Sequence, residues 1–420
     1  MANLLLAVIY LAFVSLGLPD ALLGAAWPVM TREFDVPVSW QAGISMVISA
    51  GTIVSALLSD RMTLRFGAGR VTAVSVAMTA LALAGFSFAP GFPVLVLLAI
   101  PYGLGAGGVD AALNNYVAVH YESRHMSWLH CMWGLGASLG PYIMGYALSG
   151  GHGWHWGYRC VAGIQAALTC LLILSLPLWK RRRVQAGDRE AGPQAGDREA
   201  GPQAGDREAG PQADGPEAGR KPLGIRGVLA IRGAKEILVM FFCYCALEQT
   251  AMLWSSSYMA MGRGIGNTVA ASWAALFLIG VTAGRFLSGF MTMRFDDATM
   301  IRIGQALILA GIVTLVLPLP AHLDLIGGLM LIGLGCAPIY PCVIHATPAY
   351  FGEDKSQAIV GVQMACAYVG TLVMPPLFGL LAQYVSIRLF PGYLLAILAL
   401  MTVMHERLRR LRGDALAARP

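Results

Sequence analysis

The fold is decided by residues 98–121, which read LAIPYGLGAGGVDAALNNYVAVHY. This apolar run is long enough to cross a bilayer as a helix, yet it carries Asp110, with Asn114 and Asn115 one turn further on. A carboxylate inside a span costs at least about 2.5 kcal/mol to insert, so it must face a partner or a watery cavity. The four glycines before Asp110 allow a neighbouring backbone to approach closely. We therefore expect one side of this helix to pack and another to handle a polar ligand or a proton.

The composition indicates an integral membrane protein. Hydrophobic residues make up 57% of the chain and charged residues only 12%, about half the share that is usual in soluble domains, which is roughly 25%. The sequence therefore predicts an all-α membrane protein with twelve transmembrane helices. The predicted spans centre on residues 5–30, 40–59, 71–89, 93–119, 127–149, 157–178, 236–260, 270–292, 302–319, 325–348, 357–381 and 386–404.

A segment of different character divides the chain in two. The nonapeptide AGDREAGPQ occurs three times in tandem, at residues 186–194, 195–203 and 204–212. It has no apolar face to bury, so we expect a disordered cytoplasmic linker over residues 181–233. The predicted domains are an N-terminal six-helix bundle at 1–180, a C-terminal six-helix bundle at 234–406 and a basic cytoplasmic tail at 407–420.

The basic residues are distributed as the topology of a membrane protein requires. If the N-terminus is cytoplasmic, 24 of the 29 Lys and Arg residues lie in the even-numbered loops, the central linker and the C-terminal tail. This positive-inside pattern predicts a multi-pass protein of a bacterial-type plasma (inner) membrane with both termini in the cytoplasm. The net charge of +6 is explained by topology, and we expect no nucleic-acid partner.

The two halves repeat one another. Residues 58–66 (LSDRMTLRF) and 287–295 (LSGFMTMRF) match at six of nine positions with an offset of 229. The tripeptide GLG occurs at 103–105 and again at 333–335, an offset of 230. At an offset of 234, Gly136, Pro141 and Gly145 correspond to Gly370, Pro375 and Gly379. Parallel repeats of this kind are typical of carriers that bind substrate near the midplane, between two halves that rock.

These motifs resemble the major facilitator superfamily, and in particular its fucose-permease-like branch of sugar/proton symporters. The resemblance is carried by GLPD at 17–20, by residues 103–115, 134–145 and 335–341, and by Leu247-Glu248-Gln249, Trp254 and Gly284-Arg285. It implies the major facilitator fold, with two pseudo-symmetric bundles and alternating access. The superfamily's loop motif after the second helix is only partly present, because Ala56 and Thr63 stand where glycines are usual.

Two carboxylates are the candidates for proton coupling. Burial disfavours the charged form of a carboxylate and so lets it take up a proton near neutral pH. In the symporters that the chain resembles, a carboxylate on helix 1 and another on helix 4 serve coupling and sugar binding, and the resemblance places Asp20 and Asp110 there, although the helix 4 residue is more familiar as Glu. The alternative for Asp20 is that it only satisfies backbone groups at a kink made by Pro19.

Three further charged residues are candidates for gating or charge pairing. Arg285 is the only basic residue placed inside a span, and we expect it to pair with an acid or to hold an anionic substrate, with pairing favoured. Asp60 and Arg61 lie at a cytoplasmic helix end, where we expect a gate or a helix-terminus contact. Glu248, with Gln249 beside it, aligns with Asp20 at an offset of 228 and either binds substrate or joins helices.

Aromatic and amide side chains of the kind found in carbohydrate sites surround these acids. The substrate-binding candidates are Asn114, Asn115, Trp27, His130, Trp133, Glu248, Gln249, Trp254, Tyr340 and Gln363. Helix packing and the membrane interface also use aromatic residues. Residues 136–145, with Gly-Pro at 140–141, resemble the helix 5 motif of antiporters, and close packing of the fifth helix on the eighth is the alternative.

No catalytic, metal-binding or phosphate-binding motif is present in the sequence, so we expect neither an enzyme nor a cofactor. Three hypotheses follow. The first is a secondary active transporter that takes up a small polar solute such as a sugar together with protons, working as a monomer in the lipid bilayer. The second is a proton-coupled exporter of drugs or metabolites. The third is a transport-dead receptor or scaffold whose linker is the interaction segment.

Overall fold

The computed structural model describes residues 2–37, 40–190 and 222–417, and within these ranges the regular structure is helical. The first half contains α1 (Ala2–Gly17), α2 (Leu22–Glu33), α3 (Trp40–Phe66), α4 (Ala68–Phe86), α5 (Phe92–His120), α6 (Ser123–Ser149) and α7 (Gly153–Glu190). The second half contains α8 (Ile225–Ala230), α9 (Ala234–Ser257), α10 (Asn267–Met291), α11 (Asp297–Val316), α12 (Leu323–Phe351), α13 (Glu353–Leu381) and α14 (Phe390–Ala417). Single turns of other helix types lie at Tyr258–Gly262, Pro320–His322, Ala382–Ser386 and Ile387–Leu389.

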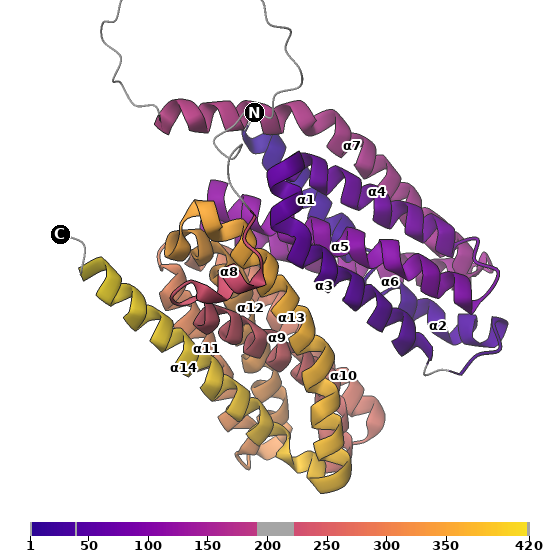
Figure 1. The fold of residues 1–420 in the computed structure, drawn as a ribbon. Coiled ribbons are helices and arrows are strands. Elements are labelled where there is room, and N and C mark those ends of the chain that lie inside the picture. Colours follow the sequence, from indigo (N-terminus) through magenta and orange to yellow (C-terminus); the bar gives the residue numbers. More distant parts are fainter. Residues whose placement is uncertain (1, 38–39, 191–221, 418–420) are drawn as a thin grey trace, which may run out of the picture.

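These helices account for the expected crossings. Among the described residues, ten helical stretches are long and apolar enough to span a membrane. One of them, Glu353–Leu411, covers both α13 and α14, which run in opposite directions (Figure 1). The remaining crossing is α6, which is less apolar because it carries serines, glycines and two histidines. With α1 and α2 forming one interrupted span, the twelve-helix prediction is confirmed.

The helices form two bundles that meet at one end and diverge at the other (Figure 1). Helix α3 packs on α13, α6 packs on α10, and α5 contacts both α12 and α13. The end of α7, α8 and the end of α14 all lie at the end where the bundles meet (Figure 1). We call this end the linker end and the opposite end the open end.

The glycines of α5 do what the sequence predicts. A side chain at Gly107 would lie 2.9 Å from the Cα atom of Thr52 on α3, and one at Gly105 would lie 2.6 Å from the carbonyl oxygen of Ser75 on α4. Neighbouring backbones therefore approach α5 on two sides. This close contact fixes the rotation of α5 and, with it, the direction in which Asp110 points.

The segment between the halves contains more helix than we expected. Helix α7 continues to Glu190, inside the expected linker, and α8 lies within it as well. Residues 191–221, where most of the tandem repeat falls, lie outside the described residues. The expected basic tail is helical as far as Ala417 because α14 continues to that residue.

Substitution of Gly107 by Ala should destabilise the protein by about 1 to 3 kcal/mol, because the added methyl group forces α3 and α5 apart. Chemical denaturation in detergent, followed by circular dichroism, measures this change. Gly43→Ala is the matched control: Gly43 is also helical, but a side chain there meets no atom within 4 Å. That variant should be unchanged or stabilised by up to about 1 kcal/mol, and equal losses in both variants would contradict the packing account.

Candidate functional site

Asp110 lies on α5 where the two bundles touch. Its side chain is buried, with 5% of its surface exposed. One carboxylate oxygen accepts a hydrogen bond from the Asn114 amide at 2.7 Å, and the other accepts one from the Tyr368 hydroxyl at 3.1 Å. Since Tyr368 belongs to α13, the carboxylate joins the two halves of the molecule.

His130 extends this arrangement from α6. Its Nε2 atom lies 3.0 Å from the side-chain oxygen of Asn114, whose amide nitrogen already donates to Asp110. An amide oxygen only accepts hydrogen bonds, so Nε2 of His130 carries the proton. The hydrogen bonds therefore run from His130 through Asn114 to Asp110. The ring of Tyr340, from α12 of the other half, packs on His130 with ring centroids 4.4 Å apart.

Asp20 sits in the break between α1 and α2. Helix α1 ends at Gly17, Pro19 follows, and α2 begins only at Leu22, so Asp20 is held in an irregular turn. Its carboxylate accepts a hydrogen bond of 2.8 Å from the indole nitrogen of Trp133 and remains exposed. Asp20 is thus tied to α6 and does more than satisfy backbone groups at the kink.

Trp133 also contacts the other half. The guanidinium of Arg285 on α10 lies 5.4 Å from the centre of the Trp133 ring, within the range of cation–π attraction. The same guanidinium forms an ion pair of 3.1 Å with Glu248 on α9. Arg285 is buried, whereas about a fifth of the Glu248 side chain is exposed. A single indole therefore links Asp20 in one half to a charged pair in the other.

The glycines of α6 position Trp133 by packing against α1. A side chain at Gly136 would collide with the backbone of Val14, and one at Gly140 would collide with that of Leu18. The packing partner of these glycines is thus the first helix. The alternative interpretation of this stretch, close packing of the fifth helix on the eighth, is confirmed in part: α6 does pack on α10, but Gly136 and Gly140 lie against the first helix and the residue after it.

We call the residues that surround Asp110, Asp20 and Trp133 the central cluster. The other candidates form their contacts elsewhere. Trp27 is buried in the core of the first half and packs on Phe92. Trp254 donates to the carbonyl oxygen of Pro375 at 2.9 Å, within the second half. The remaining placements are Gln363, buried and accepting from Thr347 at 3.1 Å; Asn115, accepting from Ser356 at 2.7 Å; and Gln249, half-buried beside Glu248 on α9.

The two residues expected at a gate lie near the linker end of α3. Asp60 is buried and accepts a hydrogen bond of 3.0 Å from the backbone nitrogen of Leu223, which belongs to the chain leading into α8. Arg61 is exposed. Asp60 therefore fastens the start of the second half to the end of α3.

Sequence reasoning missed Tyr368, although it completes the hydrogen bonds of Asp110. The offset of 234 aligns Tyr368 with Gly134, so the repeat gives no sign of a polar residue there. It also missed the contacts of Asp297 and His345 at the linker end. Here a signal existed, because an offset of 230 aligns His345 with Asn115.

The polar groups of the cluster are suited to hydrogen bonding and proton binding. Over the described ranges, no group of three or more His, Cys, Asp or Glu side chains is arranged to hold a metal ion. The cluster contains three carboxylates, at positions 20, 110 and 248, against the one guanidinium of Arg285. Such a set can bind hydroxyl groups, a cation or protons.

Comparison with known proteins agrees with this architecture. The uncharacterized transporter y4wD of Sinorhizobium fredii is 23% identical over 365 residues, which are 86% of this chain and 87% of that protein. The structure of FucP in the outward conformation superposes with a TM-score of 0.69 and 15% identity, covering 96% of this chain and 98% of FucP. The proton:xylose symporter XylE gives a TM-score of 0.69 and 12% identity, over 97% of this chain and 98% of XylE.

The family assignment rests on the whole length of the chain. The profile of the Major Facilitator Superfamily matches residues 9–321 and 237–416, which together include both bundles. The fold of the solved relatives and the observed two-bundle arrangement point the same way. This chain therefore belongs to the Major Facilitator Superfamily.

Proposed function

We propose that this protein is a secondary active transporter that takes up a small polar solute, with a sugar favoured, together with protons. The observation that carries the proposal is the chain of hydrogen bonds from His130 through Asn114 to Asp110, with Tyr368 of the other half on the second carboxylate oxygen. In this proposal Asp110 is the group that binds the proton, and it lies at the contact between halves that must separate during alternating access.

Asp110 is suited to carry a proton through such a cycle. The ionised carboxylate of Asp110 accepts a hydrogen bond from the Tyr368 hydroxyl, and the protonated carboxyl group can donate a hydrogen bond to the same hydroxyl oxygen. The hydrogen bond between Asp110 and Tyr368, which joins the two halves, can therefore form whether Asp110 is ionised or protonated. A change of charge at this buried position alters the free energy of the closed arrangement, which is the coupling that a symporter needs.

Asp20, Trp133 and Glu248 are the proposed solute contacts. Carboxylates accept hydrogen bonds from sugar hydroxyls, and an indole ring covers the apolar face of a sugar. The relatives give further support: FucP is described as the Escherichia coli fucose:proton symporter, and XylE as a proton:xylose symporter. At 15% and 12% identity these structures share the fold, so the solute of this chain is assigned from its own residues.

The positive-inside pattern assigns the linker end to the cytoplasm. In the proposed orientation both termini are cytoplasmic, the membrane is a bacterial-type inner membrane and the transporter works as a monomer. The bundles meet at the linker end and diverge at the other (Figure 1), so the described state is outward-facing in this orientation. Closure at the open end would then deliver the solute to the cytoplasm.

Uptake by proteoliposomes with an acidic exterior tests the proposal. We expect one hexose or pentose to acidify the interior of vesicles that contain the wild type. Asp110→Asn should reduce this sugar-driven proton flux at least about tenfold, because a neutral amide cannot take up the proton. Asp20→Asn should also reduce this flux, because Asp20 is the second candidate for proton coupling and a proposed solute contact. Asp354→Asn, at an exposed position near the start of α13, is the matched control and should retain full flux.

Three outcomes would replace the proposal. Proton counterflow driven by a drug or metabolite, with no response to sugars, would indicate an exporter. Downhill sugar uptake without proton movement would indicate a uniporter. Inactivity towards every solute, combined with a loss of cellular function on deletion of residues 186–219, would indicate a scaffold.

The ion pair of Glu248 and Arg285 generates a separate prediction about stability. Glu248→Gln leaves the buried guanidinium without its charged partner and should lower the free energy of unfolding by up to about 3 kcal/mol. The double variant Glu248→Gln with Arg285→Gln removes both charges and should recover most of that loss. Denaturation of the wild type, both single variants and the double variant measures the coupling energy, and additive losses would contradict the pairing.

A further inference from the structure

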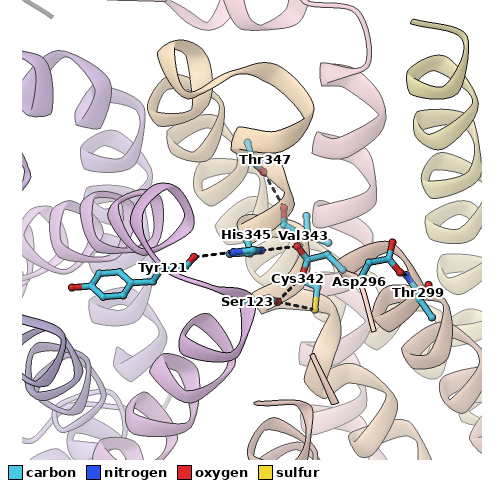
Figure 2. Close-up of polar contacts among 9 residues, drawn as sticks. Tyr121, Ser123, Asp296, Thr299, Cys342, Val343, His345 and Thr347 are labelled. Atoms are coloured by element: carbon cyan, nitrogen blue, oxygen red, sulfur yellow. Dashed lines mark hydrogen bonds and ion pairs between the residues drawn. The ribbon is translucent and has the colours of Figure 1, made fainter. Parts of the chain in front are cut away.

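A second polar cluster joins the two halves at the linker end. The hydroxyl of Ser123 donates to one carboxylate oxygen of Asp297 at 2.5 Å, and Nδ1 of His345 lies 2.6 Å from the other. Nε2 of His345 lies 3.0 Å from the backbone carbonyl oxygen of Tyr121. Figure 2 shows His345 between Tyr121 on one side and the helices of the second half on the other. We call these four residues the linker-end latch.

The latch crosses the boundary between the bundles. Tyr121 and Ser123 belong to the junction of α5 and α6, whereas Asp297 begins α11 and His345 lies near the end of α12. The bonds from His345 to Tyr121 and from Ser123 to Asp297 therefore exist only while the linker end is closed. The bond between His345 and Asp297 lies within the second half and can persist when the halves separate.

The hydrogen bonds of the closed latch require a proton. A carbonyl oxygen only accepts, so Nε2 of His345 must carry a hydrogen to contact Tyr121. A neutral imidazole then presents an unprotonated Nδ1 to Asp297, which would need a protonated carboxyl group. The closed pair is thus either imidazolium with carboxylate or imidazole with carboxylic acid. Both forms hold one proton more than a neutral histidine beside an ionised aspartate.

Opening removes that requirement. Once the Tyr121 carbonyl has left, Nε2 of His345 faces water, which can donate a hydrogen bond to an unprotonated nitrogen. Nδ1 then keeps the single hydrogen and donates it to the ionised Asp297, and the extra proton passes to the solution at the linker end. Without that proton, two acceptors would face one another in the closed latch.

We propose that the linker-end latch is a second proton-binding site, which takes up one proton when this end closes and releases it when this end opens. The site is separate from Asp110 and Asp20, and it requires no bound solute. The proposal therefore does not depend on which solute is transported or on the roles of Asp110 and Asp20. In the proposed orientation the proton would leave on the cytoplasmic side.

The repeat shows that closure itself needs no histidine. Asn115 corresponds to His345 at an offset of 230, and it accepts a hydrogen bond of 2.7 Å from Ser356 of the other half. Ser356 lies near the start of α13 as Ser123 lies at the start of α6. The same position of the repeat therefore closes one side of the interface with a neutral amide and the other with a titratable pair.

The surroundings of the latch accept an added positive charge. The negative charge of Glu122, from the first half, favours a positive charge on His345, and Glu122 is itself paired with Arg124 at 3.1 Å. On the second half, Asp296 caps the first turn of α11 through the backbone nitrogen of Thr299. The ionisable side chains close to the latch are Glu122, Arg124 and His125 from the α5–α6 junction and α6, Asp296 from α11, and Cys342 from α12.

The test measures how far the linker end is open as a function of pH. Met62 on α3 and Met293 after α10 are exposed residues of opposite halves near the linker end. Non-natural amino acids at these positions carry spin labels, so the native cysteines are kept, including Cys342, which lies 3.9 Å from the Ser123 hydroxyl. Double electron–electron resonance in nanodiscs, without solute, gives the ratio of short to long distances.

In the wild type, raising the pH should lower the ratio of closed to open molecules by about three- to tenfold per pH unit where the latch titrates, tenfold being the limit for one proton. In His345→Gln, whose amide can donate to the Tyr121 carbonyl without titrating, the contribution of the latch is lost, so that slope should fall by about three- to tenfold per pH unit, whatever contribution Asp110 makes in both proteins. Asp297→Asn should have the same effect, because an amide can donate to Nδ1 of a neutral histidine.

His152→Gln is the matched control, and this variant should keep the wild-type slope. His152 lies between α6 and α7, and the turn that joins these two helices is at the open end (Figure 1). A wild-type ratio that does not change with pH would overturn the proposal. So would an unchanged slope in both His345→Gln and Asp297→Asn. Because no solute is added, neither result depends on whether the protein transports sugars, and a failed uptake assay leaves this test intact.

Discussion

A charge that is placed inside an apolar bundle must have a partner, and this constraint organises the contact between the two halves. Arg285 is buried, forms an ion pair with Glu248 and lies over the ring of Trp133. Asp110 is buried and accepts hydrogen bonds from Asn114 and Tyr368. Each set of partners comes from more than one helix, so the charges hold helices in register. In the proposed transport cycle, separation of the halves must break or exchange these contacts, so the charge state of the interface would influence its conformation.

The close packing of glycines makes such placement possible. On α5 the glycines bring α3 and α4 against the helix, and on α6 they bring in α1. Asp110 and Trp133 therefore sit on helices whose rotation is fixed by backbone contacts. At the linker end, a neutral amide contact and a titratable contact occupy the same position of the internal repeat. The two halves are thus alike in architecture and different in chemistry.

The sequence was sufficient for the crossings, the repeat and the packing role of the glycines, because length, apolar composition and residue size decide these features locally. It also singled out Asp20, Asp110, His130 and Trp133, which the structure brings together. It could not decide which way Trp27 and Trp254 point, because a rotation of the helix by one residue exchanges a core position for an interface position. The sequence could not identify Tyr368 as a site residue, because its role depends on a hydrogen bond to Asp110 in the opposite half.

We propose that Asp110 takes up a proton at the contact between the halves. Infrared difference spectroscopy of the membrane-embedded protein tests it directly by recording spectra at low and high pH. We expect a carbonyl stretching band of a protonated buried carboxyl group that appears on acidification and is missing in Asp110→Asn. Identical difference spectra for the wild type and this variant would contradict the claim, because Asp110 would then keep one protonation state throughout.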